Sequence, residues 1–336
     1  MIEVRGLVKT FPARGGLLSQ KAVQAVKGVS FTIPDAGAVA FIGESGCGKT
    51  TIGRILTGLE TYDSGEIYYN GQNLTSLTPR ERQERLRKIQ LIQQDPYAAL
   101  NPARTIYQTL MAPLTWEAKR QQKNRDWMER RAREVLELVG LNPDVVLGKY
   151  PHMLSGGQRQ RVVIARALTV QPDVLVADEA VSMIDVSLRL GILTLLQALR
   201  RDYGIALLFI THDIAAARYI GHDGRVYVIY QGEIVEQAAT DELIQSPVHP
   251  YTQALLSAIP VLRGLEQPGP DRHIPLGEFA LAEGNGCRFA PRCRFAEQRC
   301  RDEKPPEVAW QHEEHRHTCH YPTPRRVVPE PLEAKS

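Results

Sequence analysis

The 336-residue sequence predicts an α/β fold built around a phosphate-binding loop. A short apolar run leads into the glycine-rich segment Gly43–Thr51, which is followed by a helical pattern. Two further apolar runs, Asp173–Ala180 and Ile205–Asp213, end in acidic residues or histidine. Because ligands bind beside the carboxyl ends of the strands in open parallel sheets, we expect the three segments to meet at one site.

Composition and charge exclude several classes of protein. Apolar residues make up 43% and charged residues 24%, as in ordinary globular proteins. A net charge of +3 is too small to indicate nucleic-acid binding by itself. The longest apolar run, Ile205–Ile210, is far shorter than the ~20 residues that span a bilayer. The scattered charges of the first residues argue against a secretory signal.

The segment beginning at Gly43 has the spacing Gly-x4-Gly-Lys-Thr of a P-loop, between a strand and a helix. Backbone N–H groups of such a loop wrap a phosphate chain, Lys49 adds charge at the β- and γ-phosphates, and the Thr50 hydroxyl binds Mg²⁺. We expect the Cys47 thiol, near the start of the helix, to have a lowered pKa. The residues expected at the phosphates are Gly43, Glu44, Ser45, Gly46, Cys47, Gly48, Lys49, Thr50 and Thr51.

The two later strands supply the groups that hydrolysis requires. Asp178 at the end of the first strand can bind Mg²⁺, and Glu179 beside it can polarise a water molecule toward the γ-phosphate. His212 follows the second strand and is expected to contact the γ-phosphate.

A second glycine pair, in "LSGGQRQR", opens a predicted helix after Ser155. Glycine is a poor helix former, so we infer that an anion approaches the backbone at this helix N-terminus. Apolar residues of the helix form its packing face, and Arg159 and Arg161 are expected to lie free outside it.

Over about residues 1–260, these motifs resemble the ATP-binding cassette (ABC) ATPases. The matching segments are "GESGCGKTT" (Walker A), "LSGGQRQR" (signature), "VLVADEA" (Walker B), "SMID" (D-loop, with Asp185), "QQDP" (Q-loop, with Gln94) and "THD" (switch histidine). The resemblance implies that Gln94 also reaches the Mg²⁺ and that Phe11 stacks on adenine. It implies further that the signature residues close over the ATP of a facing subunit; they are Ser155, Gly156, Gly157 and Gln158.

Three longer segments are similar to the oligopeptide/dipeptide/nickel branch of ABC importers: "QDPYAALNP", "YPHMLSGGQRQR" and "SPVHPYTQALLSAIP". This implies an ATP-hydrolysing subunit that energises import of peptides or a related small solute. Its partners would be a second, similar but non-identical ATPase subunit, two transmembrane permease subunits and an extracytoplasmic solute-binding protein, without nucleic acid. Its location would be peripheral, on the cytoplasmic face of the inner membrane. A soluble ABC ATPase acting on nucleic acid or in iron–sulfur assembly remains the alternative.

The pattern along the chain predicts its organisation. We expect a nucleotide-binding domain over 1–245, with an antiparallel β-subdomain and an α-helical subdomain over about 96–170. A connecting helical segment is expected over 246–262, and an irregular cysteine-containing extension over 263–336. Within the first domain, Asn70-Gly71 indicates a hairpin, and Thr78-Pro79 indicates a helix start.

Four of the five cysteines lie in the predicted extension: Cys287, Cys293, Cys300 and Cys319. Four soft thiolates suit an iron–sulfur cluster or zinc. The resemblance implies a [4Fe–4S] cluster, because a matching tail carries one in some peptide importers. Zinc, with help from nearby histidines, and free thiols remain open as alternatives. Five arginines could offset the charge of a cluster; they are Arg288, Arg292, Arg294, Arg299 and Arg301.

Overall fold

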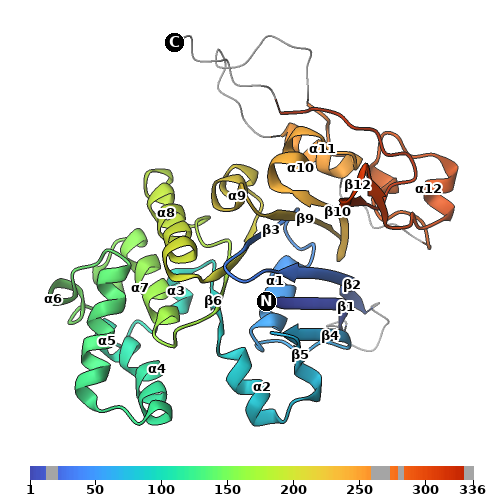
Figure 1. The fold of residues 1–336 in the computed structure, drawn as a ribbon. Coiled ribbons are helices and arrows are strands. Elements are labelled where there is room, and N and C mark those ends of the chain that lie inside the picture. Colours follow the sequence, from blue (N-terminus) through green and yellow to red (C-terminus); the bar gives the residue numbers. More distant parts are fainter. Residues whose placement is uncertain (13–21, 259–272, 279–283, 329–336) are drawn as a thin grey trace, which may run out of the picture.

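The computed structural model describes residues 1–12, 22–258, 273–278 and 284–328, which form two sheets with helices around them (Figure 1). The larger sheet has the strand order β11-β12-β10-β9-β3-β8-β7-β6. Its strands are β3 (Ala38–Ile42), β6 (Ile89–Ile92), β7 (Val174–Asp178), β8 (Ala206–Thr211), β9 (Arg225–Tyr230), β10 (Glu233–Ala239), β11 (Val308–Trp310) and β12 (His312–His317).

The centre of this sheet is parallel and completely buried. Every residue of β3, β7 and β8 is buried, as expected for parallel strands with both faces covered. Alternate residues of β8 enter different cores: Leu207 and Phe209 pack with the helical subdomain, and Leu208 and Ile210 pack with α1 (Lys49–Leu56). The parallel strands therefore deliver their carboxyl ends to one edge, as the sequence predicts.

The smaller sheet is antiparallel, in the order β2-β1-β4-β5. Asn70 and Gly71 have positive φ of 48° and 78° and form the predicted hairpin turn. The predicted helix start is also confirmed, because Thr78 caps α2 (Pro79–Leu86) in a capping box with Glu81. The strands are β1 (Ile2–Phe11), β2 (Val23–Ile33), β4 (Ser64–Tyr69) and β5 (Gln72–Asn73), followed by the short 3₁₀ helix η1 (Leu74–Ser76).

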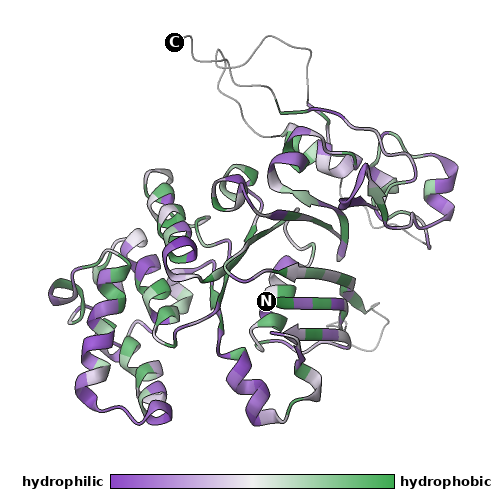
Figure 2. Cartoon of the chain, viewed as in Figure 1, coloured by the Kyte–Doolittle hydropathy of each residue, from purple (hydrophilic) through white to green (hydrophobic). Residues whose placement is uncertain are grey.

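The helical subdomain packs beside β6 and β7. Figure 2 shows green, hydrophobic stretches between its helices and mostly purple residues on α2, which buries none of its side chains. The helices of this part are α3 (Pro96–Ala99), α4 (Ile106–Gln121), α5 (Arg125–Leu138), α6 (Pro143–Val146), η2 (Pro151–Met153) and α7 (Gly156–Leu168), followed later by α8 (Val186–Tyr203) and α9 (Ile214–Gly221). None of the helices that the structure describes is long and apolar enough to cross a membrane.

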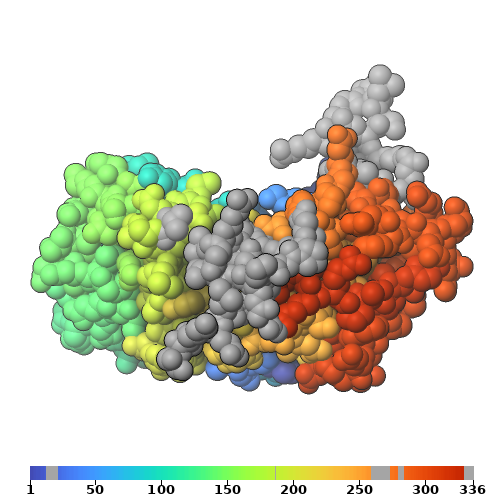
Figure 3. All heavy atoms as spheres, turned by 90° about the horizontal axis from the view of Figure 1, so that it is seen from above, coloured from blue at the N-terminus to red at the C-terminus, as the bar shows by residue number. Residues whose placement is uncertain are grey.

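The C-terminal part differs from the expected irregular extension. Strand β12 pairs antiparallel with β10, so this part of the chain extends the main sheet. The sequence "HEEHRH" of β12 has no apolar alternation, and the residues it buries are His315 and His317. Figure 3 shows this end of the chain and the helical subdomain at opposite ends of the molecule. The remaining elements are α10 (Thr240–Gln245), α11 (Pro250–Ser257), η3 (Ala290–Arg292) and α12 (Gln298–Asp302).

Candidate nucleotide site and cysteine pocket

Two glycines allow the P-loop to pass close to other backbone. Gly43 has φ 153°, and a Cβ there would lie 2.2 Å from the Ile229 carbonyl oxygen. Gly48 has φ 107°, and a Cβ there would lie 2.3 Å from the Ala25 carbonyl oxygen. These two positions therefore require glycine for steric reasons alone.

Lys49 and Thr50 connect the loop to the neighbouring strand end. The buried Lys49 ammonium donates to the carbonyl oxygens of Gly43 at 2.7 Å and Glu44 at 2.9 Å. The Thr50 hydroxyl donates to Asp178 Oδ1 at 3.1 Å. Burial raises the pKa of Asp178, and the bond from Thr50 opposes that rise. The hydroxyl and the carboxylate are both hard oxygen ligands of the kind Mg²⁺ prefers, so their pairing fits a magnesium site.

Glu179 lies between two polar side chains from the adjacent strand ends. The Gln94 amide donates to Glu179 Oε2 at 2.9 Å, and His212 Nδ1 lies 3.4 Å from Oε1. Gln94 follows β6, Glu179 follows β7 and His212 follows β8, so neighbouring strands bring together three predicted residues that are distant in sequence.

The backbone at Glu179 adopts an uncommon conformation. Its φ is 47°, in the left-handed region that glutamate rarely adopts, while its N–H donates to the Ile210 carbonyl oxygen at 2.9 Å. Such positive φ values cost of order 1–3 kcal/mol and persist where the surroundings impose them. The turn directs the carboxylate toward Gln94 and His212.

A pocket of about 240 Å³ lies over these groups. It is lined by Ala25, Ser45, Gly46, Gly48, Lys49, Thr50, Thr51, Gln94 and Glu179. Ala25 of β2 was not among the expected residues, because one alanine in a strand carries no chemical signal. Phe11 is not in this lining; it ends β1, where the Lys9 ammonium lies 5.0 Å from its ring centroid.

The signature segment lies outside this pocket. Ser155 caps α7 in a capping box with Gln158, and a Cβ on Gly156 would meet nothing within 4 Å. Gly157 is more enclosed, because a Cβ there would lie 3.1 Å from Leu188. Asp185, of the predicted D-loop, is the N-terminal cap residue of α8 without a side-chain capping bond.

The expectation that Arg159 and Arg161 lie free outside α7 is wrong. Arg159 is buried, donates to the Pro151 carbonyl oxygen at 2.6 Å and lies over the Tyr97 ring. Arg161 donates to the Val139 carbonyl oxygen. Long arginine side chains can bury their stems when carbonyls or rings receive the charged end, which helical spacing does not reveal.

The expected lowering of the Cys47 pKa is also wrong. Cys47 is only 6% exposed, and its burial raises the pKa of the thiol despite the neighbouring Lys49 ammonium, 3.5 Å from Sγ. Position at a helix start therefore does not make this thiol reactive, because desolvation outweighs the positive charge.

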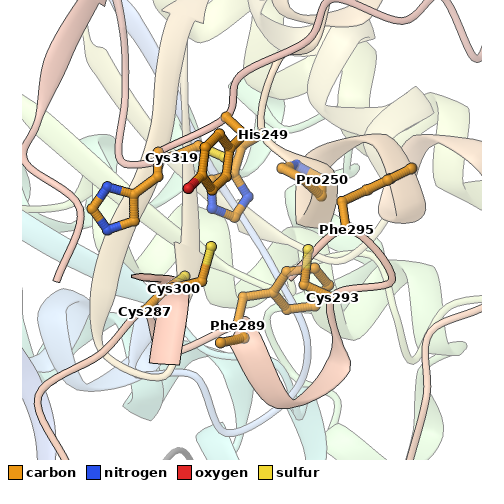
Figure 4. A pocket seen from close by; sticks show the side chains of 11 residues that line it. His249, Pro250, Cys287, Phe289, Cys293, Phe295, Cys300 and Cys319 are labelled. Carbon is orange, nitrogen blue, oxygen red and sulfur yellow. The ribbon is translucent and has the colours of Figure 1, made fainter. Parts of the chain in front are cut away.

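The four C-terminal cysteines line one small pocket of about 20 Å³ (Figure 4). Phe289, Phe295, Pro250 and His249 line it too, so the pocket is largely apolar. Burial raises the pKa of three of the thiols, to about 11 at Cys293 and about 12 at Cys319, and above its usual value at Cys287. Within the described ranges, no group of three or more potential ligands is placed to hold a metal ion. The structure therefore brings the four predicted cysteines together in one pocket, but it does not by itself show the predicted [4Fe–4S] cluster.

The neighbouring histidines and arginines mostly have other partners. His315 lies between Glu236 at 2.8 Å and Glu242 at 2.9 Å, and His312 also contacts Glu242 at 2.9 Å. Among the histidines of β12 and the residues after it, His320 lies in the lining of the cysteine pocket. Arg292, which was expected to offset cluster charge, instead binds Glu44 of the P-loop.

Comparison with known proteins identifies the family of the chain. The family described as "ABC transporter" matches residues 26–182, and "Oligopeptide/dipeptide transporter, C-terminal region" matches residues 235–300. The chain is 38% identical to the oligopeptide transport ATP-binding protein AppF of Bacillus subtilis, over 91% of this chain and 92% of that protein. It is 39% identical to the dipeptide transport ATP-binding protein DppF of Escherichia coli, over 88% of this chain and 86% of that protein.

The solved structures agree on the fold. The ATP-binding cassette MJ0796, in a dimeric post-hydrolysis state bound to ADP and Pi, matches with a TM-score of 0.61 at 28% identity. The match covers 71% of this chain and 99% of that one. The P-loop, the strand-end residues and these similarities lead to one conclusion: the chain belongs to the ATP-binding proteins of the ABC transporter family.

Proposed function

We propose that this chain is the ATP-binding and ATP-hydrolysing subunit of an ABC importer for peptides. The observation that carries the proposal is Glu179, held between Gln94 and His212 beside the P-loop pocket. Support for the peptide class comes from AppF and DppF, which are named for oligopeptide and dipeptide transport and align along nearly their whole length.

The residues divide the chemistry of hydrolysis among them. The P-loop backbone and Lys49 bind the phosphates, while Thr50, Asp178 and Gln94 would hold Mg²⁺, which neutralises phosphate charge when bound. Glu179 takes a proton from the attacking water, and Gln94 orients the carboxylate through its 2.9 Å bond. His212 contacts the γ-phosphate, and Phe11 stacks on adenine.

The signature segment acts on a second subunit. Its exposed N-terminal end, with Ser155 at the cap and Gly156 unobstructed, offers backbone donors to a phosphate held by another P-loop. Two ATPase subunits, which we infer to be similar but not identical, therefore close over two nucleotides, with Asp185 near the contact.

The remaining partners follow from import. They are two transmembrane permease subunits and an extracytoplasmic solute-binding protein, which places the chain on the cytoplasmic face of the inner membrane. We also propose the domain division 1–245, 246–262 and 263–336, in which the last part carries the cysteines. Action on nucleic acid or in iron–sulfur assembly is not favoured, because the relatives named here serve peptide transport.

We propose further that the four cysteines bind a [4Fe–4S] cluster. The donor chemistry fits, because four soft thiols line a single apolar pocket. A single zinc ion needs ligands that converge on one point, whereas a cluster distributes four thiolates over several irons. Anaerobically purified protein should contain iron and sulfide and absorb visible light. Protein that contains no iron and no sulfide and shows no visible absorption would refute this assignment.

Peptide uptake tests the main proposal. In a strain lacking this chain, uptake of a labelled dipeptide and a labelled oligopeptide should fall to background and return with the wild-type chain. Lys49→Ala should not restore it, whereas Lys119→Ala, on the exposed side of α4, should. Unchanged uptake of both peptides in the deletion strain would contradict the peptide class.

A further inference from the structure

The C-terminal part of the chain contacts the P-loop directly, through Arg292 of η3. Its guanidinium donates to Glu44 twice, from Nη1 to Oε2 at 2.6 Å and from Nη2 to Oε1 at 2.9 Å. The Arg292 side chain is 5% exposed and that of Glu44 32%. Because a two-point bond between planar groups fixes orientation as well as distance, the carboxylate cannot turn without moving Arg292.

The backbone of Gly43 and Glu44 is held at three other points, two of them by Lys49. The Glu44 N–H donates to the buried Tyr251 hydroxyl of α11 at 2.9 Å. The Glu44 carbonyl oxygen accepts from Lys49 Nζ at 2.9 Å, and the preceding Gly43 carbonyl does so at 2.7 Å. A shift of the Glu44 side chain therefore changes the peptide groups that position the phosphate-binding lysine.

The other end of the same turn forms the cysteine pocket. Phe289, Ala290 and Cys293 line that pocket, and Figure 4 shows Phe289 and Cys293 on the same side of it. The turn is closed by bonds from Arg292 N–H to the Phe289 carbonyl at 3.0 Å and from Cys293 N–H to the Ala290 carbonyl at 3.3 Å. Phe289 also packs on Tyr251, with ring centroids 5.4 Å apart.

We propose that Arg292 is a positioning residue of the nucleotide site, acting through Glu44, and that this pair couples nucleotide binding to the chemical state of the cysteine pocket. The inference rests on the proposed function, because it takes the ligand of the P-loop to be a magnesium nucleotide. Equilibrium coupling is reciprocal: if a ligand bound at Cys293 weakens nucleotide binding, bound nucleotide weakens the binding of that ligand by the same factor.

Thiol labelling of the full chain in its iron-free form, in which the four thiols are free, tests the coupling from the cysteine side. The rates at which N-ethylmaleimide modifies Cys287, Cys293, Cys300 and Cys319 are measured by mass spectrometry of peptides, which also separates Cys47. Saturating Mg-ADP should change the rate at Cys293 about fivefold or more, the low end of common allosteric coupling. In Arg292→Ala the change should disappear, and Mg-ADP should bind several-fold more weakly.

Three further variants separate positioning from a general loss of structure. Arg292→Lys should retain part of the coupling, because it keeps the positive charge but offers a single donor nitrogen in place of two. Glu44→Gln should lose the coupling while leaving the contacts of Phe289 intact, and adding Arg292→Ala to it should have little further effect. Arg299→Ala removes a surface ion pair with Glu303 in the same part of the chain and should behave as wild type.

The outcomes distinguish the two proposals. The inference is overturned if the nucleotide-dependent change in the labelling rate of Cys293 persists in Arg292→Ala. It is also overturned if Arg299→Ala abolishes that change. Tight Mg-ADP binding without any change at Cys293 in the wild type overturns the coupling but not the proposed function. Absence of Mg-ADP and Mg-ATP binding overturns both.

Discussion

The nucleotide site and the cysteine pocket are built in different ways. At the nucleotide site, Gln94, Glu179 and His212 follow three neighbouring parallel strands, and Gln94 and His212 both contact Glu179. At the cysteine pocket, the thiols come from turns and short elements, and the strand next to them, β12, carries charged residues and histidines. Neighbouring strands impose spacing on the first site, whereas contacts between turns and short elements assemble the second.

The largest expected effect tests the first site. Glu179→Gln removes the base but keeps the size of the side chain, so ATP should still bind and the two-subunit form should persist. Turnover should fall by about 10²–10⁴-fold, the usual contribution of general-base catalysis. Steady-state ATPase assays with nucleotide-binding measurements check this, and normal turnover would show that another group is the base.

The next effect concerns the packing that attaches the cysteine pocket. Phe289 is 3% exposed and contacts Tyr230 and Tyr251, so Phe289→Ala should cost about 3–5 kcal/mol of the local unfolding free energy. Hydrogen exchange should speed up over 284–328 and remain slow in β3.

Phe295→Ala is the matched control, because Phe295 also lines the pocket but is 37% exposed. Phe295→Ala should lower the local unfolding free energy much less than Phe289→Ala does. Equal losses in the two variants would mean that the aromatic contact with α11 does not hold this part in place.

A smaller effect is expected from pH. Burial opposes a charge on His315, but the bonds to Glu236 and Glu242 outweigh it and raise the pKa of His315 above its usual 6.5. Its stabilisation is therefore complete below about pH 6.5 and is lost as the pH rises through the folded pKa. Burial lowers the pKa of His249 to about 4 and also lowers the pKa of His317. These two histidines are therefore buried in their neutral form, and the stability of this part is lost as the pH falls below 6.5 and they take up protons.

Local stability of 284–328, measured by hydrogen exchange as a function of pH, should thus be highest near neutral pH. His315→Gln should remove the decline on the alkaline side and leave the acid side unchanged. An unchanged alkaline decline in His315→Gln would assign that decline to another group.

The smallest effect is expected at Cys47. Because its thiol is buried and its pKa raised, alkylation should be slow, but once it has occurred it should block ATP binding. Cys47→Ala should bind ATP within about twofold of wild type and resist alkylating reagents. A Cys47→Ala variant that is still inactivated at the original rate would place the sensitive thiol elsewhere.

Much of the nucleotide site could be predicted because each residue has a distinct local requirement. Gly48 must have positive φ, Lys49 and Thr50 must follow it, and Asp178 must end a buried strand. The strained turn at Glu179 could not be predicted, because no glycine marks it and the Ile210 carbonyl that receives its N–H comes from another strand.

The C-terminal part shows the opposite balance. The sequence indicated a cysteine group, yet β12 was expected to be irregular and Arg292 to serve the cysteines. Charged strand residues carry no hydrophobic period, and an arginine can pair with any carboxylate that the fold brings near it. Nothing in the sequence around Arg292 or around Glu44 indicates that these two distant residues form a pair.

By itself, the sequence determined the P-loop and the acidic residues at the ends of buried strands, because local geometry and hydrophobic period encode them, and its motifs indicated the ABC cassette through their resemblance to that family. Only the tertiary structure decided that β12 joins the main sheet, that Arg159 turns inward and that Arg292 bonds to Glu44. The reason is physical: backbone conformation is set largely by neighbouring residues, whereas burial and charge pairing depend on which distant segments the fold brings together.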